Sequence, residues 1–436
     1  MNEAILIRSA AIEGGDTADI LIEDGRIADV GTGLSRSGAR TIDADGLIAL
    51  PGLVDLHVHL REPGFEASET VLTGSRAAAA GGFGAVFAMP NTNPVADTAG
   101  VVEQELALGE AAGYATVQPI GAVTVGQQGE RLAELGAMAR SKARVRVFSD
   151  DGSCVWDPLL MRRALEYVKS FGGVIAQHAQ DPRLTEGAQM NEGAVSAELG
   201  LAGWPAVAEE SIIARDVLLA EHVGSRLHVC HLSTAGSVDL IRWAKKRGID
   251  VTAEVTPHHL LLTEELVRGY DARFKVNPPL RREEDVLAVR EGLADGTIDI
   301  VATDHAPHPA ETKATEWAGA AHGMVGLESA LRIVHQTMVE SGLIGWSDVA
   351  RVMSAAPARI GGLAAHGTPI AAGQPAELTL YDPSAGGAFS ERDLAGRSTN
   401  SPFFGRTLPG SVRWTIHRGY ATLADGELVD LEEARA

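Results

Sequence analysis

The segment VDLHVHLREPG, Val54–Gly64, places two histidines one residue apart at the end of an apolar run. Side chains alternate between the two faces of a strand, so His57 and His59 are expected to point to the same side. Two imidazoles in that arrangement can bind one metal ion. Arg61 follows at the next alternate position. We therefore predict that this strand ends at a metal-binding site.

Around this segment, short apolar runs rich in Val and Ile alternate with segments of helical pattern. DPLLMRRALEYVKSFGG offers Asp157 as an N-cap and Pro158 at the first helical position, and STAGSVDLIRWAKKRG offers Ser233 and Gly248 as its two caps. Eight such alternations predict an α/β protein with a (β/α)8 TIM barrel over residues 52–363. The eight runs are GLVDLHVHL (52–60), FGAVFAMPN (83–91), ATVQPIGAVT (115–124), VRVFSDDG (145–152), GVIAQHAQ (173–180), RLHVCHLS (226–233), IDVTAEVTPHH (249–259) and IDIVATDHAPH (298–308).

The two ends of the chain have a different pattern, with short strands and tight turns. ADILIEDGRIADVG contains Asp24-Gly25 between two apolar runs, YATLADGELVD contains Asp425-Gly426 in the same setting, and AELTLYD is a further strand. Asp-Gly between alternating apolar residues is a strong hairpin signal. We predict that residues 1–51 and 364–436 together form a small β-sandwich module, with the metal-dependent catalytic barrel inserted between them.

Composition narrows the class of protein. The chain has 436 residues, 45% of them hydrophobic, and a formal net charge of −21. It can bury a sizeable core, but it lacks the basic surface that nucleic acid or an anionic membrane would need. Its two cysteines, Cys154 and Cys230, form no CxxC pattern, which argues against a thiolate zinc site. Without a signal-peptide pattern or an apolar run near the roughly 20 residues that span a bilayer, we expect a soluble cytoplasmic protein.

Residues that can bind metal follow most of the predicted strands. In a (β/α)8 barrel the carboxyl ends of the strands meet at one face and carry the chemistry. A set of histidines and carboxylates without thiolate is typical of a catalytic zinc or a similar divalent ion. Four histidines and two aspartates are enough for two ions that share a carboxylate. The strand-end candidates are His57, His59, Asp150, Asp151, His178, His231 and Asp304.

Other polar residues near the strand ends are predicted to play supporting roles. His305, next to Asp304, should point away from it, and His258 and His259 are expected to support the ligands rather than bind metal. His228 lies an odd number of positions from His231, so we expect it to face the helices. Cys230 should face the helices as well, as a packing residue.

Seven motifs together resemble the dihydroorotases, amidohydrolase-superfamily enzymes of pyrimidine biosynthesis. The resemblance covers essentially the whole chain, and HLREPG combined with MPNT is more specific than HxH or DHAPH alone. It implies that His57, His59 and Asp304 bind a first metal, that His178 and His231 bind a second, and that Asp304 is the catalytic acid/base. The motifs are DLHVHLREPG, MPNTNP, FSDDG, HVCHLST, VTPHHLLLT, FKVNPPLR and ATDHAPH.

One feature separates this chain from many of those relatives, which join the two metals through a carbamylated lysine on the fourth strand. This chain has VRVFSDDG there, without lysine. It resembles the bacterial branch in which an aspartate bridges, and each oxygen of a carboxylate can bind one metal. Asp151 is the predicted bridge and Asp150 the alternative. The expected cofactor is two divalent ions per chain, with zinc as the expected metal.

The resemblance also implies a set of substrate contacts. Arg61 and Asn91 would hold a substrate carboxylate, because a guanidinium matches a carboxylate through two hydrogen bonds. His322 and Gly323, within AHGMVGLE, stand where the family presents a substrate-contacting backbone, although an apolar residue or proline is common at the position of His322. The remaining predicted contacts are His59, Asn277 and His308.

The implied activity is the reversible hydrolysis of L-dihydroorotate to N-carbamoyl-L-aspartate. One alternative is a related cyclic amidase, such as a dihydropyrimidinase, hydantoinase or allantoinase, which usually uses the carbamylated lysine and a neutral ring. Another is a non-catalytic partner of aspartate transcarbamoylase, which would lack metal ligands. All of the ligands are present here. Besides the small-molecule substrate, the candidate partners are a second copy in a homodimer and an aspartate transcarbamoylase.

Overall fold

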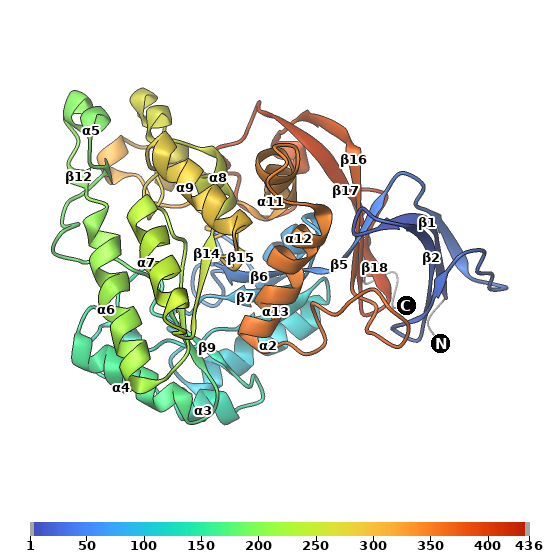
Figure 1. Cartoon of the computed structure of the whole chain (residues 1–436), viewed down its shortest axis with the longest axis horizontal. Coiled ribbons are helices and arrows are strands. Elements are labelled where there is room, and N and C mark those ends of the chain that lie inside the picture. The colour runs from blue at the N-terminus through green and yellow to red at the C-terminus, as the bar shows by residue number, and fades with distance from the viewer. Residues whose placement is uncertain (1–3, 432–436) are drawn as a thin grey trace.

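The computed structural model describes residues 4–431, and its central feature is a set of eight parallel strands with helices around them (Figure 1). One sheet has the order β6-β7-β8 and another the order β15-β14-β13-β10-β9. Isolated parallel bridges join the two sheets at both ends, between Gly121 and Phe148 and between Val58 and His305. All eight predicted strands are confirmed. They are β6 Leu53–Val58, β7 Phe83–Ala88, β8 Thr116–Pro119, β9 Val147–Phe148, β10 Val174–Gln177, β13 Leu227–Val229, β14 Val251–Val255 and β15 Ile300–Val301.

Helices connect the successive strands, and their caps largely follow the sequence. The Asp157 side chain accepts a hydrogen bond from Leu160 N at the start of α4, as predicted. The helix α7 begins one residue later than predicted, with Thr234 as its N-cap. The reason is that Ser233 uses both its backbone N–H and its hydroxyl to contact Glu209. These helices are α1 Val71–Ala80, α2 Ala99–Ala112, α3 Leu135–Arg140, α4 Pro158–Lys169, α6 Val207–Val223, α7 Ala235–Lys246 and α9 Glu283–Ala294.

The loops after β10, β14 and β15 are long and contain short elements of their own. They hold β11 Met190–Asn191, α5 Ala194–Leu199, β12 Gly203–Trp204, α8 Pro257–Leu261, α10 Ala310–Lys313 and the single 3-10 turns Glu264–Gly269, Ala272–Phe274 and Trp317–Gly319. The chain then forms a helical region of α11 Ala330–Val334, α12 Trp346–Ala350 and α13 Ala356–Gly361, with π-helical turns at His335–Val339 and Arg351–Ala355. Three further 3-10 turns are Val125–Gln127, Leu327–Ser329 and Glu391–Asp393.

The parallel strands are buried on both faces, as expected for strands covered by helices. Val54 and Leu56 of β6 pack with Phe87 of β7 in one apolar cluster. Leu53 and Val58 of the same strand belong to a second cluster, which includes residues of the surrounding helices. No helix within residues 4–431 is long and apolar enough to cross a membrane.

Strands from both ends of the chain form one nine-stranded sheet, seen beside the parallel strands in Figure 1. Its order is β19-β18-β17-β16-β5-β1-β2-β3, with β4 paired to β1. The two chain ends meet where β5 pairs antiparallel with β16, with Pro51 opposite Leu378. The strands are β1 Ile5–Ile12, β2 Thr17–Glu23, β3 Arg26–Gly31, β4 Arg40–Asp43, β5 Ile48–Pro51, β16 Leu378–Ala388, β17 Thr407–His417, β18 Tyr420–Ala424 and β19 Glu427–Leu428.

The predicted Asp-Gly turns join β2 to β3 and β18 to β19. Asp24 and Gly25 have φ values of 48° and 76°, and Asp425 and Gly426 have 52° and 86°. Two successive positive φ values are the signature of the type I′ hairpin turn, which Asp-Gly adopts readily. The sheet is held by an apolar cluster that we call the terminal-sheet core, which contains Ile5, Ile7, Ile20, Ile22, Ile27, Ile42, Leu378, Leu380 and Ile416.

Candidate metal centre and active site

Six of the predicted ligands lie together at the carboxyl ends of β6, β9, β10, β13 and β15, and we call them the strand-end cluster. Each is at most 5% exposed. Strand alternation places the first two on one side of β6, whereas later members depend on local backbone geometry. The φ values of His231 and Asp304 are 33° and 48°, in the left-handed region that costs a non-glycine residue of order 1–3 kcal/mol. The cluster comprises His57, His59, Asp151, His178, His231 and Asp304.

Asp151 lies at the centre of the cluster and faces two pairs of histidines. Its Oδ1 is 3.2 Å from His178 Nδ1 and 3.4 Å from His231 Nε2. Oδ1 also lies 3.4 Å from His57 Nε2, and Oδ2 lies 3.3 Å from His59 Nε2. One carboxylate is therefore shared by two groups of candidate ligands, Asp151 with the first histidine pair and Asp151 with the second.

Asp304 and Asp150 occupy very different positions relative to this centre. Asp304 Oδ1 is 3.1 Å from His59 Nε2 and 3.5 Å from His57 Nε2. Asp150 Oδ1 instead accepts hydrogen bonds from Val123 N at 2.8 Å and Thr124 N at 3.0 Å. The alternative bridge thus supports the loop after β8, and Asp151 is the aspartate that faces the histidines.

Three imidazoles of the cluster are oriented by the ring nitrogen that points away from it. Each of these nitrogens contacts a carboxylate or amide oxygen, which can only accept, so that nitrogen carries the proton. When the ring is neutral, its other nitrogen presents a lone pair to the centre. The pairs are His57 Nδ1 with Glu254 Oε1 at 2.6 Å, His59 Nδ1 with Asn91 Oδ1 at 2.8 Å and His178 Nε2 with Gln180 Oε1 at 2.8 Å.

The arrangement that results fits a divalent cation. Imidazole lone pairs and carboxylate oxygens face one another, which is repulsive unless a positive charge lies between them. His57 Nε2 is buried and has no hydrogen-bond partner among the described residues. Neutral imidazole and carboxylate are ligands that zinc and similar ions accept. The buried His/Asp cluster is therefore compatible with a divalent metal site.

Burial and charge shift the pKa values of the cluster in different directions, and burial together with the charge of Arg61 lowers the pKa of His59. Burial alone would raise the pKa of Asp151 and of Asp304, but the charge of His57 and hydrogen bonds from histidines outweigh it and lower both pKa values. Burial would likewise lower the pKa of His57, but the charges of Asp151 and Glu254 raise it well above its usual range. The carboxylates thus stay ionised and attract positive charge to the centre.

Glu254 is a buried carboxylate that the sequence analysis missed. Its Oε1 accepts from His57 Nδ1 and from His231 N at 3.2 Å, and its Oε2 lies 3.0 Å from His228 Nε2. Burial would raise the pKa of Glu254, but His57 and His228 lower it. A lone glutamate inside the apolar run VTAEV was the available signal, because a buried carboxylate in a strand needs partners.

The prediction that His228 and Cys230 face the helices is wrong. His228 binds Glu254 on the side of β13 that carries the ligands, and Cys230 packs in the same cluster as Val54 and Leu56. The prediction assumed regular strand alternation from His231 back to His228. His231 lies beyond the end of β13 and has a positive φ, so the alternation does not extend to it. The expected packing role of Cys230 agrees with its burial.

Arg61 and Asn91 lie beside the cluster with donor groups that are not neutralised. Arg61 Nε donates to Pro307 O at 3.2 Å, and its guanidinium forms no ion pair with any carboxylate in residues 4–431. Burial lowers the pKa of Arg61 to about 10, so it remains charged at neutral pH. Asn91 uses its Oδ1 for His59, which leaves its Nδ2 as a donor. The pair can bind an anionic group next to the candidate metal centre.

His308, His322 and Gly323 lie on the loop after β15, close to Arg61. His308 Nε2 donates to His322 O at 2.7 Å, so the 3.5 Å approach of Arg61 Nη2 to that nitrogen brings two donors together. Burial and the nearby guanidinium lower the pKa of His308 to about 3, which keeps its ring neutral. Gly323 has a φ of 128°, and a Cβ there would lie 2.7 Å from the Ala306 Cβ.

Asn277 is brought to the cluster by Gln180, a second residue that the sequence analysis missed. Asn277 Nδ2 donates to Gln180 Oε1 at 3.0 Å, the same oxygen that His178 Nε2 contacts. Asn277 Oδ1 is buried and has no hydrogen-bond partner within residues 4–431. Gln180 stands two positions after His178, and this spacing was the signal that could have found it.

The three supporting histidines lie outside the cluster. His305 Nδ1 accepts from Gly326 N at 3.2 Å, while its Nε2 approaches Glu69 Oε2 at 3.5 Å, so it points away as predicted. His259 Nδ1 lies 2.8 Å from Thr256 Oγ1. Burial lowers the pKa of His258 to about 4, which keeps that ring neutral beside the cluster.

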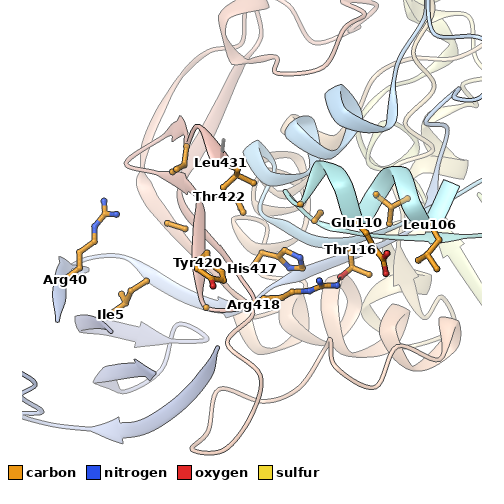
Figure 2. A pocket seen from close by; sticks show the side chains of 17 residues that line it. Ile5, Arg40, Leu106, Glu110, Thr116, His417, Arg418, Tyr420, Thr422 and Leu431 are labelled. Atoms are coloured by element: carbon orange, nitrogen blue, oxygen red, sulfur yellow. Dashed lines mark hydrogen bonds between the residues drawn. The ribbon is translucent and has the colours of Figure 1, made fainter. Parts of the chain in front are cut away.

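A cavity of about 680 Å³ lies elsewhere, between the terminal sheet and α2 (Figure 2). His417 and Arg418 face it from the end of β17, and Arg418 Nη2 donates to Thr116 Oγ1 at 3.4 Å. None of its lining residues is a predicted site residue.

Solved structures with the same fold are cyclic amide hydrolases. The L-hydantoinase (dihydropyrimidinase) from Arthrobacter aurescens superposes with a TM-score of 0.87 at 25% identity, covering 99% of this chain and 98% of that one. A dihydropyrimidinase from Brevibacillus agri gives a TM-score of 0.83 at 23% identity, over 98% and 96% of the two chains. Together with the buried His/Asp cluster and the relatives below, this fold defines a metal-dependent cyclic amide hydrolase.

Sequence relatives narrow that class. The dihydro-orotase-like family model matches residues 46–237. Dihydroorotases from Leifsonia xyli, Streptomyces coelicolor and Mycobacterium tuberculosis are 74%, 67% and 53% identical to this chain. The matches cover 97–98% of this chain and 98–99% of the relatives. The chain belongs to the dihydroorotase family, which confirms the resemblance found in its motifs.

Proposed function

We propose that this chain catalyses the reversible hydrolysis of L-dihydroorotate to N-carbamoyl-L-aspartate, a step of pyrimidine biosynthesis. The observation that carries the proposal is the guanidinium of Arg61, which forms no ion pair among the described residues and lies beside a cluster compatible with metal. Dihydroorotate joins a cyclic amide to a carboxylate, so it would use both features at once. The neutral rings of the rival amidases would leave Arg61 buried without a counter-charge.

We propose two divalent ions, with zinc as the expected metal. His57, His59 and Asp304 would hold the first ion, His178 and His231 the second, and Asp151 both. The distances from Asp151 to all four histidines support this division. When bound, the ions would polarise the ring carbonyl and make water at the centre more acidic.

Asp304 is the proposed acid/base. Its lowered pKa keeps it ionised, so it can accept a proton from the attacking water and pass it to the leaving ring nitrogen. In the direction of ring closure the same carboxyl takes the proton back. Glu254 supports this chemistry from outside by fixing the orientation of His57.

The substrate would be oriented by residues around the cluster. Arg61 and the Nδ2 of Asn91 would bind the ring carboxylate. The other proposed contacts are His59, Asn277, His308 and the backbone at His322 and Gly323. The use of the His322 carbonyl by His308 supports a defined backbone conformation at this loop.

The finer architecture is also a proposal. The two bridges that link the parallel sheets at both ends support a closed (β/α)8 barrel over residues 52–363. For residues 1–51 and 364–436 we propose a β-sandwich module, of which 1–3 and 432–436 lie outside the described residues. The proposal is supported by β1, which pairs with β4 through Ile5–Arg8 and with β5 through Ala11–Ile12. One strand can thus contribute to both layers of a sandwich.

The test is hydrolysis of L-dihydroorotate by the zinc-loaded protein, with dihydrouracil, hydantoin and allantoin in parallel. We expect a preference for dihydroorotate and a loss of about 10²-fold or more in kcat/KM for Arg61→Ala, because a buried charge pair is removed. Arg140→Ala, at an exposed residue of α3, is the matched control. Turnover of a neutral ring alone would overturn the proposal in favour of a related amidase.

Bound metal without turnover of any of these four rings would instead favour the non-catalytic role beside an aspartate transcarbamoylase. A homodimer and an association with that transcarbamoylase are candidate assemblies of the active enzyme as well. Light scattering of the protein, alone and mixed with the transcarbamoylase, distinguishes a monomer, a dimer and a mixed complex.

A further inference from the structure

Two long loops carry the proposed substrate contacts that do not lie at a strand end. The loop after β14 presents Asn277, and the loop after β15 presents His308, His322 and Gly323. Neither loop is part of the parallel sheets, so their mutual position depends on contacts between them. Substrate binding needs the two loops to keep a fixed position relative to each other, since a displacement of even 1 Å at a site has a large effect on catalysis.

A lysine of the second loop reaches into the first. Lys313, at the end of α10, is 8% exposed. Its Nζ donates to Ala272 O at 2.9 Å and Lys275 O at 3.1 Å in the loop after β14. The third hydrogen bond goes to Ala321 O at 2.8 Å in its own loop, next to His322. All three protons of the ammonium are thus used by backbone carbonyls.

A lysine of the first loop reaches into the second. Lys275 is 2% exposed, and its Nζ donates to Trp317 O at 2.6 Å and Ala318 O at 3.1 Å. The same ammonium lies 5.8 Å from the centre of the Trp317 ring. Gly323 N then donates to Lys275 O at 2.9 Å. Each lysine therefore donates to the other loop, so the two side chains cross in opposite directions. Lys275 lies two positions before Asn277.

Joining two loops through these lysines costs free energy, because two ammonium groups are buried. Neither ammonium forms an ion pair with a carboxylate anywhere in the described chain, and burial is the first cause that lowers the pKa of both Lys275 and Lys313. Apolar side chains of similar size could fill the space without burying charge. What an ammonium adds is direction, because its donors fix particular carbonyls at particular distances.

We propose that Lys275 and Lys313 form a reciprocal clasp that positions the loops after β14 and β15 for substrate binding. The lysines are positioning residues and touch neither the proposed ligands nor the reacting atoms. The proposal rests on the proposed function for its effect on substrate. The clasp itself can be tested without any turnover.

The first experiment compares Lys313→Met, Lys275→Met and the double variant with the parent enzyme. Methionine keeps an apolar chain of similar length and removes the ammonium. Loss of hydrogen bonds from a charged donor should raise KM for L-dihydroorotate about tenfold in each single variant. The kcat should stay within about threefold, because the ligands are not touched. Metal content per chain and the midpoint of urea unfolding are measured in parallel.

The double variant tests whether the two lysines act as one device. Residues of a shared network do not have additive effects. We expect the double variant to raise KM by clearly less than the product of the two single effects. Lys142→Met, at an exposed lysine before β9, is the matched control and should leave KM and kcat unchanged. Either single variant is sufficient if the other fails to fold.

Hydrogen exchange supplies the readout that does not depend on substrate. We expect faster exchange in residues 272–277 and 306–325 of both single variants and unchanged exchange in residues 53–60. Unchanged exchange would overturn the clasp. Faster exchange with KM unaltered would overturn its positioning role. If the parent enzyme turns over no dihydroorotate, the proposed function fails, while exchange still decides whether the clasp exists.

Discussion

The strand-end cluster and the terminal-sheet core are equally closed to water, yet they are composed of opposite kinds of residue. The terminal-sheet core consists of isoleucine and leucine side chains that are at most 5% exposed, and burial of such groups stabilises the fold by roughly 25 cal/mol per Å². The strand-end cluster is just as buried and contains four histidines and two aspartates. Its burial opposes folding unless partners or a cation compensate the charges.

The backbone shows the same contrast. Arg61, His231 and Asp304 have positive φ values at or beside the cluster. In the terminal sheet, positive φ values at Asp24 and Asp425 belong to hairpin turns where Asp-Gly accommodates them. One buried region therefore supports stability, and the other uses that stability to hold buried polar side chains in a strained arrangement. Substitutions should separate these two roles.

The largest expected effect is on catalysis, from Asp304→Asn. Asparagine keeps the shape of the side chain but cannot take a proton from water. We expect hydrolysis of L-dihydroorotate at saturating zinc to fall by about 10²–10⁴-fold, the range for loss of a general acid or base. Steady-state kinetics together with metal analysis measures this. Activity within about tenfold of the parent, with metal retained, would remove Asp304 from its proposed role.

The next effect concerns stability and should spare catalysis. Ile20→Ala deletes a fully buried side chain of the terminal-sheet core. Such truncations destabilise proteins by about 2–5 kcal/mol. Urea unfolding should show a lower midpoint, while kcat/KM of the folded protein stays unchanged. A large loss of kcat/KM without loss of stability would mean that the two regions are not separate in function.

A smaller effect on metal binding is expected from Glu254→Gln. The amide can still accept from His57 but lacks the charge that makes the imidazole a better ligand, so zinc affinity should fall by about 10–100-fold. Glu377→Gln is the matched control, because Glu377 is also buried and contacts His417 Nδ1 at 2.9 Å, far along the chain from the cluster. Competition with a zinc chelator measures both variants, and equal affinities would contradict the proposed support of His57.

The smallest effect is on the pH dependence of stability, from Glu105→Gln. Burial raises the pKa of Glu105 well above 4.5, and no described residue forms a hydrogen bond with its Oε2. Because the folded state holds the proton more tightly than the unfolded state, this carboxyl lowers stability as pH rises above about 4.5. The variant should be more stable than the parent by about 1 kcal/mol at pH 7 and show little difference at pH 4. Urea midpoints at the two pH values measure this, and a constant difference would contradict it.

Much of the fold was predictable because it depends on local pattern. Each parallel strand is a short apolar run, and the Asp-Gly turns are local signals. His57 and His59 were predictable for the same reason, since they lie two positions apart at the end of one strand. The aspartate that faces the histidines was harder to predict, because Asp150 and Asp151 both lie beyond the two residues of β9 and strand alternation no longer applies.

The rest of the site depends on contacts between distant segments. Glu254 reaches His57 across 197 positions, and no spacing rule connects them. The side of His228 was wrongly predicted because the chain turns at His231. Lys275 and Lys313 bind backbone carbonyls, whose positions depend on the tertiary structure and leave no motif. Sequence pattern therefore identified the six residues that the structure gathers at the strand ends, and missed the residues that contact them from distant segments.

The most direct test of the central claim is a zinc titration of the metal-free protein, with the bound metal counted per chain in the parent and in Asp151→Ala. The account predicts about two ions per chain in the parent, as expected for a centre with a shared carboxylate. It predicts that Asp151→Ala weakens both sites together. A single ion in the parent, or a variant that keeps one site at full affinity, would contradict Asp151 as the shared ligand of this centre.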